Sequence, residues 1–255
     1  MKKLVGLALM ISALALTRQA VANSTEKNNQ TTQVSEKLIQ LQLEQNITIG
    51  RAIKSIVNHY PQNAASIVET ALDLYPDKYK EIIHAAISAQ PTLADEVVTI
   101  AISKGITSCS SIVETAINAD PSYIDFVVTA AAHSTPEELR EIVRIAVITE
   151  PDSADYIVQS LAKEHPNKII EILQSAISAV PFVGEYAVQA LLAIFPNDAE
   201  NVITTAVRES GAEREHVIRI IETAQNAGID LKKLETYAIN GGATTEELSG
   251  VLDKK

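Results

Sequence analysis

All nine prolines of this 255-residue chain fall on one grid with a spacing of fifteen residues. The single vacant slot of the grid is at Ile106, and Gly105 stands directly before it. Such a spacing does not arise by chance, so the chain contains an internal repeat, which has to be interpreted before any single residue. The grid consists of Pro61, Pro76, Pro91, Pro121, Pro136, Pro151, Pro166, Pro181 and Pro196.

Each block of the grid has the hydrophobic pattern of one α-helix. Counted from the proline, apolar residues recur at positions 4, 7, 8, 11 and 12, as in Leu139, Ile142, Val143, Ala146 and Val147. Spacings of three and four residues place these side chains on one helical face and exclude a strand. Proline suits the first position of a helix, and the next proline ends it. We therefore expect a helix of about twelve residues and a connection of about three in every block.

The residue before each proline is expected to act as the helix N-cap. Asp120 and Thr135 have suitable side chains, and Thr135 with Glu138 forms the sequence pattern of a capping box. At the vacant slot, Gly105 is expected to end its helix in the left-handed conformation, with a hinge or contact site as the alternative.

Alternate blocks differ chemically, which indicates two layers of helices. Connections this short make neighbouring helices antiparallel, so two blocks form a hairpin of thirty residues. Position 5 is acidic in every second block, at Asp95, Asp125, Asp155, Glu185 and Glu215, whereas the blocks between them are mixed there. The prediction is an all-α protein, an α/α solenoid of about fourteen short helices that forms a right-handed superhelix.

In this arrangement of blocks the chain resembles α-helical repeat proteins in the broad sense, the HEAT-like and TPR-like solenoids. The resemblance is architectural and covers most of the chain, but the unit is shorter than theirs and the TPR consensus residues are absent. It implies a scaffold that binds other proteins or peptides.

The first residues have the pattern of a secretory signal peptide. Lys2 and Lys3 precede an apolar run that is too short for a membrane span, and an A-x-A cleavage pattern ends at Ala22. An uncleaved membrane anchor is the alternative. We expect a bacterial protein that is periplasmic or secreted, with a signal peptide at 1–22, a flexible leader at 23–33 and no membrane insertion after cleavage.

Residues 34–255 are expected to form a single helical repeat domain with degenerate ends. The N-terminal cap is 34–60, with a helical stripe at Val34, Leu38 and Leu41; the regular repeats are 61–225, and the C-terminal cap is 226–255. In the C-terminal cap, Lys232 and Lys233 occupy core positions of the repeat. The apolar face of that block is therefore expected to rotate onto Ile229, Leu234 and Tyr237, and Thr244 with Glu247 to cap the last helix.

The chain after the signal peptide is strongly acidic. Removing residues 1–22 takes away three bases and no acid, which leaves 18 bases against 32 acids and a net charge of −14. Such a surface argues against nucleic acid and anionic lipid as partners and tolerates cationic ones. The alternative is that the acidity only keeps an alanine-rich helical protein soluble.

Residues capable of catalysis are scattered. Cys109 is the only cysteine and is expected to be buried, with a disulfide-linked dimer or a reactive thiol as alternatives. The five histidines share neither a column nor an i, i+4 spacing, and the sequence has no glycine-rich phosphate loop, G-x-S-x-G or CxxC. We expect no catalytic residues, no metal site and no cofactor.

The clearest candidate site is a column of aromatic residues at position 6 of alternate blocks. Phe126, Tyr156 and Tyr186 recur thirty residues apart, nearly opposite the apolar stripe, and Phe182 lies one turn before Tyr186. Exposed aromatic side chains in a row are typical of a contact surface, whereas packing between hairpins is the alternative. Asp125, Asp155 and Glu185 stand beside them, either to select basic groups or to pair with Lys80, Arg140 or Arg144 of the other layer.

These patterns favour an exported, non-enzymatic interaction protein that binds a polypeptide on one helix layer and prefers cationic groups. Two alternatives remain at this point. One is a structural or matrix protein that self-associates through the ends or edges of the solenoid, so that a homo-oligomer forms. The other, more remote, is an enzyme or a carrier of a small ligand.

Overall fold

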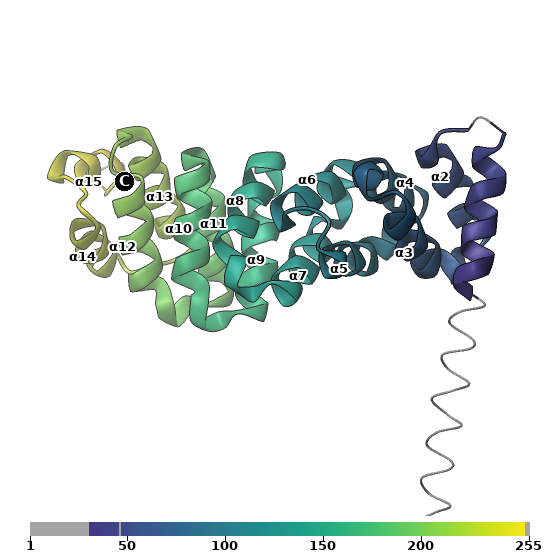
Figure 1. Ribbon diagram of the computed structural model, residues 1–255. Helices are drawn as coiled ribbons and strands as arrows, with labels where there is room; N and C mark the ends of the chain where they lie inside the picture. The colour runs from purple at the N-terminus through teal and green to yellow at the C-terminus, as the bar shows by residue number, and fades with distance from the viewer. Residues whose placement is uncertain (1–30, 46, 253–255) are drawn as a thin grey trace, which may run out of the picture.

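The computed structural model describes residues 31–45 and 47–252 and shows an elongated stack of short helices (Figure 1). The expected signal peptide at 1–22 lies outside the described residues, and so does the leader as far as residue 30. The last three residues of the expected leader, 31–33, belong to a helix that runs over 31–43.

Each regular block consists of a 3₁₀ turn followed by an α-helix of eleven residues. The proline opens the turn, not the α-helix as expected, and the α-helix begins three residues later. The α-helices are α2 (Ile49–His59), α3 (Ala64–Leu74), α4 (Tyr79–Ala89), α5 (Ala94–Lys104), α6 (Cys109–Ala119), α7 (Ile124–Ser134), α8 (Leu139–Thr149), α9 (Ala154–Glu164), α10 (Ile169–Ala179), α11 (Gly184–Ile194), α12 (Ala199–Glu209), α13 (Arg214–Asn226), α14 (Leu231–Gly241) and α15 (Thr245–Leu252). The 3₁₀ turns are η1 (Pro61–Asn63), η2 (Pro76–Lys78), η3 (Pro91–Leu93), η4 (Pro121–Tyr123), η5 (Pro136–Glu138), η6 (Pro151–Ser153), η7 (Pro166–Lys168), η8 (Pro181–Val183) and η9 (Pro196–Asp198).

The connection between blocks is a single residue, shorter than expected. The residue before each proline has φ between −121° and −156°, outside the helical region. This follows from the steric clash between a proline ring and a helical residue before it. Because one extended residue reverses the chain, successive helices must fold back on each other.

Of the two expected N-caps, one is confirmed and one is wrong. The Asp120 carboxylate accepts a hydrogen bond of 3.0 Å from the backbone N–H of Ser122. Thr135 does not cap, and no capping box forms with Glu138. Its hydroxyl lies 3.0 Å from the carbonyl oxygen of Ala131 in the preceding helix, a common alternative for threonine at a helix end.

The helices form two layers, and within each layer successive helices pack side by side. The even layer contains α2, α4, α6, α8, α10, α12 and α14, and the odd layer contains α3, α5, α7, α9, α11, α13 and α15. Polar contacts within a layer join residues that are 31 apart in sequence, such as Lys104 with Asp73 and Arg140 with Glu171. The offset is one hairpin plus one residue. The prediction of an all-α solenoid built from fifteen-residue units is confirmed; within the described residues there is no strand.

The core is one continuous cluster that extends from Ile39 to Val251 between the two layers. It is formed by the five apolar positions of each block. Leu139, Ile142 and Val143, for example, are completely or almost completely buried. Every hairpin therefore buries its apolar stripe against the hairpins before and after it.

At the position of the grid that lacks a proline, other residues end one helix and begin the next. Gly105 has φ +60° and ends α5 in the left-handed conformation, which confirms the expectation. The Ser108 hydroxyl then accepts a hydrogen bond of 3.3 Å from the backbone N–H of Ser111 and caps α6. A glycine stop and a serine cap thus replace one proline.

At the N-terminal end, the predicted apolar stripe is partly wrong. Val34 and Leu41 are exposed, whereas Ile39 is buried and Ser35 lies 3.3 Å from Ser66 of α3, measured between the hydroxyl oxygens. The first helix has therefore turned its Ile39 side towards α3, because contact with the next helix of the same layer decides which face is buried.

At the C-terminal end the predictions are confirmed. Lys232 and Lys233 are exposed while Leu234 is fully buried, and Ile229 and Tyr237 pack against the core. Thr244 and Glu247 form the expected capping box: Glu247 Oε2 accepts from the Thr244 backbone N–H at 2.7 Å, and Thr244 Oγ1 accepts from the Glu247 N–H at 3.3 Å.

Candidate functional site

The aromatic column lies on the outer face of the odd layer. Phe126, Tyr156 and Tyr186 occupy the same position in α7, α9 and α11, and these helices pack directly on one another. Their exposed fractions are 50%, 61% and 46%, and that of Phe182 in η8 is 47%. Tyr123 supports Phe126, with ring centroids 5.6 Å apart and ring planes tilted by 35°. Large apolar side chains are thus presented to solvent at the same point of three successive hairpins.

The acids beside the column have different surroundings. Asp125 and Asp155 have no ion-pair partner among the described residues. Glu185 instead accepts a hydrogen bond of 3.2 Å from Arg219 of α13, which also binds Glu215 at 2.8 Å. The hydrogen bond from Arg219 lowers the pKa of Glu215, and the bonds to Glu215 and Glu185 raise the pKa of Arg219. Two of the three acids are therefore available to an external cation.

The alternative, in which these acids pair with bases of the other layer, is not found among the described residues. Arg140 binds Glu171 at 3.0 Å, and Arg144 binds Glu141 within its own helix. Lys80 has no ion-pair partner among the described residues. The reason is geometric: residues 31 apart face each other within a layer, whereas acids and bases of opposite layers lie on opposite faces of the solenoid.

Two hollows in the odd layer meet at Asp125. The first, of about 490 Å³, lies across α5, α7 and α9, and Asp95, Asp125 and Phe126 line it. The second, of about 360 Å³, extends from Asp125 to Tyr156. These hollows bring together three of the residues predicted from the sequence. Asp155, Phe182, Glu185 and Tyr186 line neither hollow.

Sequence reasoning missed the far wall of the first hollow. His133, Lys163 and Glu164 line it, and His133 Nε2 lies 3.9 Å from the Glu164 carboxylate. They come from the ends of helices, at positions 13 and 14 of the block. A signal was present, because Ala130 and Ser160 are small residues at position 10 and leave room between neighbouring helices.

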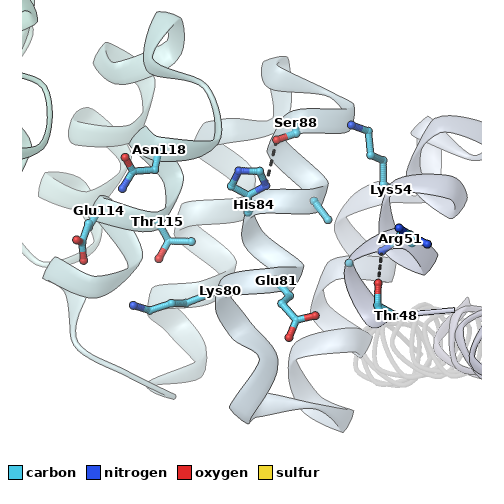
Figure 2. Close-up of a pocket in the computed structure, with 12 residues that line it drawn as sticks. Thr48, Arg51, Lys54, Lys80, Glu81, His84, Ser88, Glu114, Thr115 and Asn118 are labelled. Atoms are coloured by element: carbon cyan, nitrogen blue, oxygen red, sulfur yellow. Dashed lines mark hydrogen bonds between the residues drawn. The ribbon is translucent and has the colours of Figure 1, made fainter.

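Sequence reasoning also missed a larger hollow, of about 560 Å³, on the even layer (Figure 2). It lies across α2, α4 and α6 near the N-terminal end of the stack. Arg51, Lys54 and Lys80 line it together with His84, whose Nδ1 lies 3.3 Å from the hydroxyl of Ser88. The sequence signal was that Arg51, Lys54 and Lys80 all lie in blocks of the layer without the aromatic column.

Cys109 is buried, as the sequence indicated. Burial raises the pKa of its thiol, while Thr135 donates a hydrogen bond of 3.4 Å to the sulfur. A protonated, buried thiol is a poor nucleophile. Within residues 31–45 and 47–252 no group of three or more histidine, cysteine or acidic side chains is placed to hold a metal ion. In the same part of the chain, no helix has the length and apolar character needed to cross a membrane.

Comparison of the chain with protein families, with curated proteins and with solved structures finds no match in any of the three. The relation to helical repeat proteins therefore rests on architecture. What the protein does has to be inferred from its surface.

Proposed function

We propose that this protein is an exported, non-enzymatic scaffold that binds a polypeptide on its odd layer, around the aromatic column. The observation that carries the proposal is the exposure of Phe126, Tyr156 and Tyr186 at equal positions of three adjacent helices. Burying such rings supplies most of the energy of a typical protein contact. The signal-peptide pattern at 1–22 is what supports the proposal that the protein acts in the periplasm or outside the cell.

The electrostatics of the column favour a partner with cationic side chains. Asp125 and Asp155 lie beside the rings without an ion-pair partner among the described residues, and Asp125 lines both hollows. An arginine of the partner that stacks on Phe126 or Tyr156 reaches these carboxylates at the same time. Glu185, already bound to Arg219, contributes less.

The test is affinity capture from the native cell envelope with a matched pair of triple variants. One variant carries Phe126→Ala, Tyr156→Ala and Tyr186→Ala. The control carries Tyr60→Ala, Leu74→Ala and Ile148→Ala, which removes the same number of exposed apolar side chains from other places. Circular dichroism shows whether both variants fold, which is expected because all six side chains are exposed.

We expect the control to retain a captured polypeptide that the column variant loses. In the captured complex, Asp125→Asn with Asp155→Asn should weaken binding by about tenfold and reduce its salt dependence. Equal retention by both folded triple variants would show that the column is not the binding site.

A second candidate function is self-association through the ends of the solenoid, and a specific observation favours it. Terminal repeats usually carry a polar outer face. Here Val34 and Leu41 are exposed at one end and Leu231 and Ile239 at the other, where they border a hollow of about 350 Å³. Molar mass should then rise with concentration by analytical ultracentrifugation, and Leu41→Ser with Ile239→Ser should keep the protein monomeric. A constant monomer mass rejects this candidate.

A further inference from the structure

The hollow of the even layer is a groove with a small-residue floor and charged walls. Gly50 of α2 and Ala85 of α4 line it, and neither has a side chain larger than a methyl group. Figure 2 shows Arg51 and Lys54 extending from α2 on one side and Lys80 extending from α4. Three side-by-side helices span about 16–20 Å at usual interaxial distances of 8–10 Å. An extended peptide of five or six residues covers that length.

The cations of this groove are not neutralised by the protein. Arg51, Lys54 and Lys80 have no ion-pair partner among the described residues. Of the two acids that line the groove, Glu81 is bound to Lys78 at 3.3 Å, which leaves only Glu114 on the α6 wall. In a chain this acidic, three unpaired cations on one groove are a local excess of positive charge that favours an anionic ligand.

A second groove on the same layer shows that the excess is specific to the first. It lies across α8, α10 and α12 with a volume of about 470 Å³, and Arg140 and Arg144 line it. There both cations are neutralised, because Arg140 binds Glu171 at 3.0 Å and Arg144 binds Glu141. The two grooves thus share their position in the repeat but differ in charge.

One residue accounts for the unpaired state of Lys80. Arg140 and Glu171 are 31 residues apart, and the residue 31 after Lys80 is Ser111. Where the second groove supplies a carboxylate, the first supplies a hydroxyl, which lies 2.8 Å from the Tyr79 hydroxyl. Lys80 is therefore left without the partner that the repeat geometry provides elsewhere.

We propose that this groove, between α2, α4 and α6, binds an extended acidic segment of a partner polypeptide. Aspartate or glutamate side chains of the segment pair with Arg51, Lys54 and Lys80 while its backbone lies over Gly50 and Ala85. A short peptide fits better than a nucleic acid or a sulfated polysaccharide, because the groove is as long as five or six extended residues, whereas a long polyanion would continue beyond it over the acidic surface of the chain. The groove is on the layer opposite to the aromatic column, so the proposal is independent of the function proposed above.

The test measures binding of a fluorescein-labelled octaglutamate peptide by fluorescence anisotropy, at low and at high ionic strength. The groove variant carries Arg51→Ala, Lys54→Ala and Lys80→Ala. A control with Arg140→Ala, Arg144→Ala and Lys168→Ala removes the two cations of the second groove and Lys168, which lies 4.0 Å from Glu171, so that both variants have the same net charge. A third variant, Ser111→Glu, places a carboxylate 31 residues after Lys80, as Glu171 is 31 residues after Arg140.

We expect the natural chain to bind octaglutamate and the groove variant to bind it at least about tenfold more weakly, with the control within about twofold of the natural chain. Ser111→Glu should weaken binding several-fold without removing a cation, and high salt should weaken binding in every case. Two results overturn the proposal: no binding of octaglutamate, or an equal loss of binding in the groove and control variants.

Discussion

Gly105 shows at the residue scale how a repeat tolerates the loss of its most regular feature. Elsewhere a proline stops one helix and starts the next, whereas here a left-handed glycine stops α5 and Ser108 starts α6. A side chain at Gly105 would meet no atom within 4 Å. The requirement for glycine therefore comes from the backbone alone, because a left-handed φ strains any residue with a Cβ.

Replacing Gly105 and Gly50 by alanine should change stability in opposite directions. Gly105→Ala is expected to lower the free energy of unfolding by about 1 kcal/mol, through backbone strain. Gly50→Ala is expected to raise it by about 0.5 kcal/mol, because Gly50 is helical and the added methyl group makes only ordinary contacts. Urea titration followed by circular dichroism compares the two; a stabilising Gly105→Ala would contradict the strain argument.

The residue scale also shows which local signals were decisive in the sequence. Asp120 caps as predicted because its short carboxylate reaches the N–H two residues on. Thr135 has the same position in its block, but its hydroxyl donates a hydrogen bond to the Ala131 carbonyl oxygen of the preceding helix and accepts none from the following turn. The sequence does not distinguish between these two local partners. The position of a cap was thus predictable and its hydrogen bond was not.

At the scale of elements, single contacts join helices of the same layer. Lys104 at the end of α5 binds two acids of α3, Asp73 at 2.8 Å and Glu69 at 3.0 Å. The hydrogen bond to Asp73 raises the pKa of Lys104 above its ordinary value of 10.5. The side chain is largely buried, although both acids are more than half exposed, so solvent screening reduces the stabilisation.

Lys104→Met should lower the free energy of unfolding by about 1 kcal/mol at neutral pH. Because the pKa of Lys104 is raised in the folded state, its contribution is complete below pH 10.5 and is lost as the pH rises through the folded-state pKa. The difference between Lys104→Met and the natural chain should therefore shrink at strongly alkaline pH. Lys54→Met, which removes an exposed lysine without an ion-pair partner, is the control, and urea titrations across this pH range are the measurement. A difference that stays constant with pH would exclude the charge as its cause.

Two helices of the even layer, α12 and α14, approach closely at Gly241, the last residue of α14. A Cβ added there would lie 2.7 Å from Val207 Cβ and 2.8 Å from the Thr204 carbonyl oxygen of α12. The Thr204 hydroxyl donates a hydrogen bond of 3.1 Å to the Tyr237 carbonyl oxygen in the same region. This close approach was not predicted from the sequence, because a close approach between helices leaves no sequence pattern beyond a small residue.

Gly241→Ala is expected to lower the free energy of unfolding by about 2 kcal/mol. The added methyl group would clash with Val207 Cβ and with the Thr204 carbonyl oxygen of α12, and a side-chain rotation moves neither atom away. Asn240→Ala, one residue earlier on an exposed side, should change it by less than about 0.5 kcal/mol. Urea titration of the pair measures the difference. A neutral Gly241→Ala would mean that α14 can move away from α12 without loss of packing.

At the scale of the whole molecule, the fold was predictable and most of the site was not. The fold follows from a pattern repeated in every block, so one misjudged cap at Thr135 does not change the result. The site depends instead on single departures from the repeat. Lys80 is unpaired because Ser111 stands where Glu171 stands relative to Arg140. This effect of Ser111 can be recognised only when the offset of 31 residues between facing positions of a layer is known. Exposure of the aromatic column was expected from its position, whereas the hollows that connect Phe126 and Tyr156 through Asp125 required coordinates.

The same repetition determines how stability is distributed along the stack. Each hairpin contacts only its neighbours, so the loss of one contact should destabilise a local group of helices and leave distant ones unchanged. Hydrogen exchange by mass spectrometry tests this with Gly241→Ala. We expect faster exchange in peptides from α12 to α15, with α2 to α6 exchanging as in the natural chain. Gly105→Ala is the reciprocal control, because it should accelerate exchange around α5 and α6 and leave α13 to α15 unchanged. If either substitution accelerates exchange equally along the whole chain, the stack unfolds as one cooperative unit and the nearest-neighbour description does not apply.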